Sequence, residues 1–338
     1  MMSVSRKERT GKSMKLGITG TGMIVQDLMP AYKDIGIEKT WIQATPRSEE
    51  KAKAMVSTYG LDGYVLDYDE LLKQDIDTVY VALPNHLHYA FALEAIQAGK
   101  HVMIEKPVCA NVKELQSLLD EAAKAGVYIY EAMTIHDTPV YKGLKQSLGK
   151  VGDVKIVSFN YSQYSSRYDA FKRGEILPAF DYHKAGGALY DINVYNIHGV
   201  VGLFGKPLSV HYEANIEKGI DTSGILTMDY GTFKAVCIGA KDCQAPVSLN
   251  IQGDEGVLNM TRPLSRMHEF SYITNKGDSE TFSYESDTHR MVYEFKEFMR
   301  IIDNHDDQAA RAHNDISMTC AQIMQDARTQ KGIVFDND

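Results

Sequence analysis

Short apolar runs alternate with longer amphipathic segments from Lys15 to about residue 134. The apolar runs predict buried strands, and the segments whose apolar residues recur every three to four positions predict helices. Repeated strand–helix units are typical of a parallel sheet with helices on both faces. The expected strands span 15–19, 40–45, 77–83, 101–104 and 127–132, and the expected helices span 22–36, 48–60, 67–73, 86–99 and 111–126.

The pattern changes after a connecting helix expected at 139–150. Only one clear helix, at 186–205, interrupts a series of strands, and strands in series predict a mostly antiparallel sheet. Two helices, at 288–303 and 308–329, close the chain. The eight expected strands span 153–164, 208–216, 223–230, 232–240, 246–253, 256–260, 265–274 and 280–286.

This organisation predicts two domains. Residues 14–134 are expected to form an α/β domain built on a doubly wound parallel sheet. Residues 135–338 are expected to form an α+β domain with a large, mostly antiparallel open sheet, and its closing helices can pack back on the first domain. Residues 1–13 are basic and polar without an apolar stretch, so we expect a disordered tail and not a secretion signal.

The composition argues against several classes of protein. The net charge of −9 argues against a nucleic-acid partner, because phosphate binding needs a basic face. Four cysteines stand far apart without a C-x-x-C pair, which favours a reducing cytoplasm and gives neither a disulfide framework nor a zinc site. No apolar run approaches the roughly 20 residues of a membrane span. We therefore expect a cytoplasmic protein without a resident metal.

A glycine-rich turn follows the first expected strand. Gly20, Thr21 and Gly22 lie between that strand and the helix that begins near Met23 and Ile24. Glycines at such a turn let backbone N–H groups approach a pyrophosphate, as in Rossmann dinucleotide-binding domains. By itself G-x-G is also found in ordinary strand–helix turns, but the repeated strand–helix units favour dinucleotide binding.

The second expected strand ends in a sequence that bears on the choice of cofactor. A carboxylate at its tip would bind the ribose 2′-hydroxyl of NAD, but the tip offers Thr45, Pro46 and Arg47. An arginine can hold the 2′-phosphate of NADP, whereas a carboxylate would repel it. Arg47 can equally be a solvated residue beside a helix start. We expect NADP, with NAD as the alternative.

Four motifs together resemble the Gfo/Idh/MocA family, which includes glucose–fructose oxidoreductase and inositol 2-dehydrogenase. They are the G-x-G loop, an N-x-x-H motif at Asn85 and His88, an E-K-P motif at 105–107, and the segment "GGALYDINVY" at 186–195. The resemblance runs from Met14 to the last helices. Val25 replaces the third loop glycine, and Asn193 stands where the family usually has glycine.

The resemblance implies a nicotinamide-dependent oxidoreductase that acts on a secondary alcohol or carbonyl of a sugar, polyol or diol. It also implies that Lys106 lies beside both nicotinamide and substrate. Two alternatives stay open: a redox sensor that binds the cofactor without turnover, and a glycoside hydrolase that uses the cofactor transiently.

The chemistry of hydride transfer assigns roles to the motif residues. A reacting hydroxyl needs a proton carrier and a group that stabilises the developing alkoxide. Lys106, held between Glu105 and Pro107, fits the second need, and we expect Glu105 and Lys106 to contact the cofactor. On a helix, Asp191, Tyr195 and His198 would share one face. There Tyr195 would carry the proton, with a nearby ammonium favouring its phenolate.

The remaining assignments follow from the same scheme. Asp191 would orient the substrate or Lys106, and His198 would contact the substrate. If Tyr195 is not the proton carrier, Lys106 is.

Pro84 and Asn85 would contact the nicotinamide ribose, and His88 either assists or is a helix-surface histidine. The segment 161–184 forms either a wall over the substrate or an ordinary loop. One bare face of the large sheet favours a homodimer or homotetramer.

Overall fold

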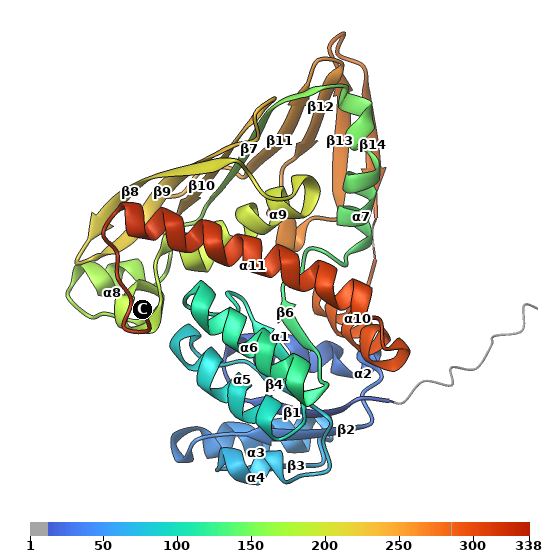
Figure 1. The fold of residues 1–338 in the computed structure, drawn as a ribbon, viewed down its shortest axis with the longest axis vertical. Coiled ribbons are helices and arrows are strands. Elements are labelled where there is room, and N and C mark those ends of the chain that lie inside the picture. The colour runs from blue at the N-terminus through green and yellow to red at the C-terminus, as the bar shows by residue number, and fades with distance from the viewer. Residues whose placement is uncertain (1–12, 285) are drawn as a thin grey trace, which may run out of the picture.

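The structure is a computed structural model that describes residues 13–284 and 286–338. The tail expected at 1–13 lies outside the described residues except for Ser13. Two sheets organise the chain, one in each half, and the last two helices run along the junction between the halves (Figure 1).

The first sheet has six parallel strands in the order β3-β2-β1-β4-β5-β6. This confirms the predicted Rossmann-type sheet. The order reverses between β1 and β4, and open α/β sheets bind ligands at the carboxyl ends of strands beside such a switch point. The strands are β1 Lys15–Thr19, β2 Lys39–Gln43, β3 Gly63–Val65, β4 Thr78–Val81, β5 His101–Glu105 and β6 Ile129–Ala132.

The helices of this half begin and end close to the positions that the sequence predicts. Pro30 divides the first expected helix into three short pieces, and Gly36 ends the last of them in the left-handed conformation. Asn111 caps α6 by accepting the backbone N–H of Glu114 at 2.8 Å. The helices are α1 Met23–Leu28, α2 Tyr32–Ile35, α3 Glu49–Tyr59, α4 Tyr68–Leu72, α5 His88–Gln97 and α6 Val112–Ala125.

The second sheet has eight strands in the order β14-β13-β12-β11-β7-β10-β9-β8. Only β7 and β10 pair in parallel, so the prediction of a large, mostly antiparallel sheet is confirmed. The strands are β7 Val154–Ser162, β8 Ser209–Glu217, β9 Ile220–Asp229, β10 Lys234–Ala240, β11 Ser248–Gly253, β12 Gly256–Met260, β13 Glu269–Thr274 and β14 Ser279–Ser283.

The helices of this half depart from the prediction at two places. The segment 161–184, expected to be a wall or an ordinary loop, contains the short helix α8. The single helix expected at 186–205 begins as a π-helical turn, η7 Leu189–Asn193, and only then continues as α9. Helix α11 contacts α6 and β6 of the first half and α9 and β8 of the second, so it ties the halves together. The helices are α7 Pro139–Gln146, α8 Tyr168–Lys172, α9 Val194–Phe204, α10 Arg290–Asn304 and α11 Asp307–Gln330.

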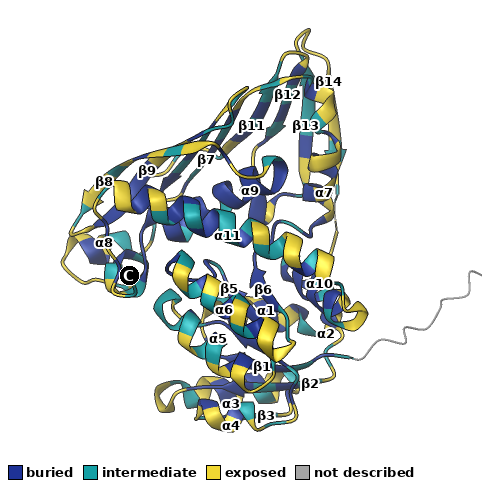
Figure 2. Cartoon of the chain, viewed as in Figure 1, coloured by how far each residue is buried: buried dark blue, intermediate teal, exposed yellow. Residues whose placement is uncertain are grey.

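Buried residues lie between the sheets and the helices that cover them (Figure 2). In the second half, Val157 and Phe159 of β7 pack with Val194 and Ile197 of α9 in one core. This packing sets α9 firmly against the sheet and so fixes where its first turn meets the tip of β5. None of the described helices is both long and apolar enough to cross a membrane.

Candidate active site

Lys106 lies at the junction of the two halves, directly after the last residue of β5. The peptide bond that joins it to Pro107 is cis. Its side chain is 15% exposed, and its Nζ donates to the backbone carbonyl of Asp191 at 2.9 Å and lies 3.3 Å from Asp191 Oδ1. The same Nζ lies 4.9 Å from the centre of the Tyr195 ring. The structure therefore brings together the three residues expected to be catalytic.

A second lysine, which the sequence motifs do not predict, completes the cluster. Lys241 directly follows β10 and is almost fully buried. Its Nζ donates to the carbonyl of Ala179 at 3.1 Å and to Asp191 Oδ2. Asp191 thus bridges two ammonium groups, one from each half of the molecule. Lys241 immediately follows a buried strand, as Lys106 does. This position is the one feature of the sequence that could have suggested Lys241.

The charges of this cluster support one another. Burial by itself would lower the pKa of Lys106, but Tyr195, Asp191 and Glu105 outweigh it and raise that pKa above its usual value. Burial would raise the pKa of Asp191, but Lys241 and Lys106 hold it well below its ordinary range. Lys106 is therefore a cation and Asp191 an anion at neutral pH.

Tyr195 differs from the expectation in its ionisation. Burial raises the pKa of its hydroxyl above the usual value, and the opposing effect of Lys106 is smaller. The ammonium favours the phenolate as expected, but desolvation outweighs it in this structure. Tyr195 is a neutral phenol at neutral pH and is suited to donate a proton to a carbonyl oxygen.

His198 does not join this cluster. One turn beyond Tyr195, α9 has entered the core, and His198 is only 1% exposed. Its Nδ1 lies 3.2 Å from Nε2 of His136, and its Nε2 lies 3.5 Å from Oε2 of Glu131. Burial lowers its pKa, so the ring is neutral. This position does not support the expected substrate contact, because the ring faces protein groups beneath the site.

Glu105, the last residue of β5, is buried beside the cluster. Its carboxylate accepts the hydroxyl of Tyr80 within the core of the first half. Burial raises the pKa of Glu105 to about 7. The side chain anchors the tip of β5 and so helps to hold the backbone of Lys106 in place.

The glycine-rich loop has the shape that a dinucleotide needs. Gly20 has φ +89°, and a Cβ there would lie 2.9 Å from the carbonyl oxygen of Ala82, so only glycine fits this turn. A Cβ at Gly22 would meet no described atom within 4 Å, so this glycine leaves the backbone open to a ligand. Thr21 is buried, Ile24 is half-buried, and Met23 is 68% exposed. The residues present therefore fit a pyrophosphate.

Thr45 and Arg47 lie where the sequence predicts, at the carboxyl end of β2. The side chains of Thr45 and Ser48 each accept a hydrogen bond from the backbone N–H of the other residue. These two bonds fix the short helical turn that carries Arg47. The Arg47 side chain is exposed and has no ion-pair partner within 13–284 or 286–338. It is therefore available to an anionic group.

The N-x-x-H motif serves the architecture in this structure. The Asn85 amide donates to the carbonyl of Ala185 at 2.8 Å and so links the two halves. His88 is fully buried, and its ring nitrogens lie 2.9 Å from the carbonyl of Pro107 and 2.8 Å from that of Leu83. His88 thus joins the loop after β4, which contains the exposed Pro84, to the loop after β5. His88 is therefore not a helix-surface histidine.

One group of side chains outside this site has metal-binding composition. Donor atoms of Asp137, Glu297 and His313 all lie within 4.8 Å of one another. Asp137 already accepts the hydroxyl of Tyr130, and Glu297 pairs with Arg300. Both carboxylates therefore have partners in the chain, and the expected lack of a resident metal stays a prediction.

Comparison with known proteins agrees with this geometry. Residues 14–133 match the model of an oxidoreductase family with an NAD-binding Rossmann fold. The scyllo-inositol 2-dehydrogenase (NADP(+)) IolU of Bacillus subtilis is 33% identical over 96% of this chain and 99% of its own. The trans-1,2-dihydrobenzene-1,2-diol dehydrogenase of Danio rerio is 26% identical over the same shares of the two chains.

A solved structure shows the same fold. KijD10, a 3-ketoreductase from Actinomadura kijaniata in complex with NADP and TDP-benzene, superposes with a TM-score of 0.81 at 21% identity. The match covers 94% of this chain and 98% of KijD10. With the fold, the order of the motifs and the inositol dehydrogenase relative in agreement, this protein belongs to the Gfo/Idh/MocA family of NAD(P)-dependent oxidoreductases.

Proposed function

We propose that this oxidoreductase prefers NADP and interconverts a secondary alcohol and a carbonyl on a sugar, polyol or diol. The observation that carries the proposal is the Lys106–Asp191–Tyr195 cluster at the carboxyl end of β5, beside the loop that fits a pyrophosphate. The inositol, diol and keto-sugar activities of the relatives support the class of substrate.

The proposed mechanism divides the work among three side chains. The nicotinamide, when bound, supplies or accepts the hydride. During reduction, Tyr195 Oη donates its proton to the carbonyl oxygen as the hydride reaches the carbonyl carbon. The Lys106 ammonium stabilises the negative charge that develops on that oxygen. Asp191 holds Lys106 in place, and Lys241 neutralises the second oxygen of the Asp191 carboxylate.

A substrate panel tests this proposal. Purified protein is mixed with NADP⁺ or NAD⁺ and scyllo-inositol, other inositols, aldoses and trans-diols, and with NADPH and the corresponding ketones, while nicotinamide absorbance is followed. Turnover of a member supports the proposal. Cofactor binding in calorimetry without turnover of any member favours a sensor, and release of an aglycone without net change in NADPH favours a glycoside hydrolase.

Replacing Arg47 by serine is expected to raise KM for NADPH by roughly 10- to 100-fold and to leave KM for NADH nearly unchanged. A hydrogen bond to a charged group contributes about 1.5–3 kcal/mol, and only NADPH carries the 2′-phosphate. Steady-state kinetics with both cofactors measure the change. Arg311→Ser is the matched control, because Arg311 is an exposed arginine on α11. An unchanged ratio of the two KM values would show that Arg47 is only a solvated residue.

The second sheet supports the proposal of a homodimer or homotetramer. Helices α9 and α11 contact one side of it, while Ile156 and Ile225 on the other side are 47% and 46% exposed (Figures 1 and 2). Ile225 pairs across β9 and β10 with the half-buried Ile238. Exposed isoleucines on a bare sheet face are the kind of surface that a second copy buries.

Replacing Ile225 by arginine is expected to convert the oligomer to a monomer, because a charge would be desolvated in the interface. Light scattering coupled to size-exclusion chromatography measures the mass. Ile176→Arg is the control, because Ile176 is also 46% exposed but lies outside the sheet. A wild-type protein that stays monomeric at all concentrations would contradict the proposal.

A further inference from the structure

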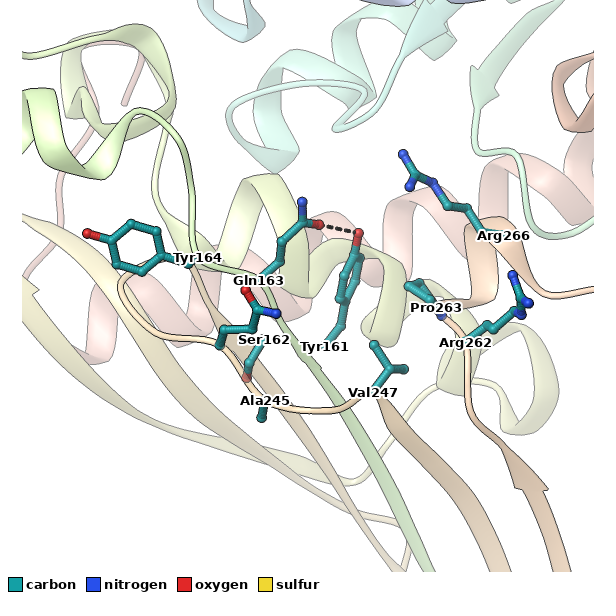
Figure 3. A pocket seen from close by; sticks show the side chains of 10 residues that line it. Tyr161, Ser162, Gln163, Tyr164, Ala245, Val247, Arg262, Pro263 and Arg266 are labelled. Atoms are coloured by element: carbon teal, nitrogen blue, oxygen red, sulfur yellow. Dashed lines mark hydrogen bonds between the residues drawn. The ribbon is translucent and has the colours of Figure 1, made fainter.

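A cavity of about 420 Å³ lies in the second half of the molecule (Figure 3). Its volume falls within the roughly 300–1,000 Å³ of small-molecule sites. The cavity is formed where β7 ends and where the chain leaves β12. The lining residues that bear on a ligand are Tyr161, Gln163, Arg262 and Arg266.

The lining is positively charged in an acidic protein. The chain carries a net charge of −9, yet the cavity has two arginines and no carboxylate. Three other arginines, Arg290, Arg300 and Arg328, form ion pairs with carboxylates. Within 13–284 and 286–338, the guanidinium groups of Arg262 and Arg266 have no ion-pair or hydrogen-bond partner, and both side chains are exposed. Two unpaired guanidinium groups in one cavity favour an anion.

Polar groups of the lining can assist such an anion. The Tyr161 hydroxyl donates to Gln163 Oε1 at 2.9 Å, as Figure 3 shows. This bond fixes the orientation of the Gln163 amide, whose NH₂ has no acceptor among the described residues. Carboxylate and phosphate oxygens accept hydrogen bonds from both guanidinium and amide N–H groups.

The cavity is close enough to the reaction centre to hold part of the same small molecule. The ring centres of Tyr161 and Tyr195 are 6.3 Å apart. Tyr161 is paired with Gly239 in the parallel β7–β10 ladder, so the cavity begins beside the strand that delivers Lys241. Burial raises the pKa of Tyr161, while Arg266 and Lys106 both oppose the rise, so both cations are near its hydroxyl.

We propose that this cavity binds an anionic substituent, a carboxylate or a phosphate, on the polyol or sugar that the enzyme oxidises or reduces. This inference rests on the proposed function and specifies its substrate class. Arg262 and Arg266 bind the oxyanion, with bidentate geometry available to each guanidinium. The reacting carbon of the same molecule lies within reach of the Tyr195 hydroxyl and the Lys106 ammonium. The anion therefore selects the substrate and sets which hydroxyl reaches the nicotinamide.

The test compares sugars that differ in charge. Calorimetry measures binding of D-glucuronate, D-glucose 6-phosphate and D-glucose to the full chain, and kinetics with NADP⁺ measure kcat/KM for the same three. We expect at least one anionic sugar to bind tenfold or more tightly than glucose, and the two anions distinguish carboxylate from phosphate. In Arg262→Gln/Arg266→Gln this preference is expected to fall at least tenfold, because the affinity for the anionic sugar falls far more than the affinity for glucose.

Two controls sharpen the result. Arg311→Gln removes an exposed arginine outside the cavity, so it should retain the preference. Arg262→Lys/Arg266→Lys keeps the charge but loses the bidentate geometry, so it should retain part of the preference. Thermal unfolding checks that each variant is folded.

The outcomes separate this inference from the proposed function. Anions that bind no more tightly than glucose, or that bind the double glutamine variant as tightly as wild type, overturn the anionic subsite even if neutral sugars are turned over. Arginine-dependent anion binding without turnover of any panel member supports the subsite as a binding site and overturns the proposed function.

Discussion

Replacing Lys106 by methionine is expected to lower kcat/KM for hydride transfer by roughly 10³-fold. Removing a charge that stabilises a developing oxyanion typically costs about 10²- to 10³-fold, and this ammonium also helps to set the position of Asp191. Methionine keeps the length and apolar body of the side chain, so the cavity is nearly conserved. Initial rates with NADPH and the best ketone of the panel measure the loss.

The second lysine is not expected to compensate. Lys241 Nζ is held by the carbonyl of Ala179 and by Asp191 Oδ2, and the side chain is almost fully buried. It remains, however, as a partner for Asp191, so the variant should still fold. Lys113→Met, on the exposed side of α6, is the matched control. A Lys106→Met enzyme within about threefold of wild type would contradict the proposed mechanism, since general acid–base and electrostatic contributions are much larger.

Much of the fold could be predicted because its signals are local. The eight strands of the second sheet appear as alternating apolar runs, and Gly36, Gly60 and Gly126 end helices in the left-handed conformation. The sequence did not predict β3, because its three residues begin with glycine and are too short to show a period. The π-helical turn at 189–193 was also missed, because one extra residue per turn leaves no compositional signal.

The candidate site also contains some residues that the sequence can suggest and others that it cannot. Lys106, Asp191 and Tyr195 belong to motifs, so the sequence could suggest them before the structure brought them together. Lys241 could not be found, because its place depends on the parallel pairing of β10 with β7, which are about 80 residues apart. The partners of Asn85 and His88 are backbone carbonyls of distant loops, and a sequence does not show such partners.

Electrostatics was the least predictable part of the site. From the sequence, an ammonium beside Tyr195 favoured a phenolate, because opposite charges stabilise each other. The structure adds burial, which the sequence cannot reveal, and burial dominates the pKa of Tyr195. The proposed mechanism therefore starts from a different protonation state of Tyr195 in each direction of the reaction. Reduction uses the neutral phenol that is present at neutral pH, whereas oxidation needs the phenol to lose its proton.

Replacing Tyr195 by phenylalanine is therefore expected to lower kcat for reduction by roughly 10²- to 10⁴-fold, the usual contribution of a positioned proton donor. It is also expected to change the pH profile. In the wild type, the reduction rate should stay constant through neutral pH and fall only as pH rises through the raised pKa of Tyr195, because deprotonation removes the donor. The phenylalanine variant should lack this fall. Reduction rates across neutral and alkaline pH measure both effects.

Tyr272→Phe supplies the control, because Tyr272 is a half-buried tyrosine on β13 whose hydroxyl donates only to the carbonyl of Glu255. That variant should match wild type in rate and in pH profile. Cofactor affinity should be unchanged in both variants, since neither hydroxyl belongs to the phosphate loop. If Tyr195→Phe instead keeps the wild-type rate and profile, the proton must come from Lys106. The ammonium would then be donor and electrostatic stabiliser at once, and its own raised pKa would set the alkaline fall.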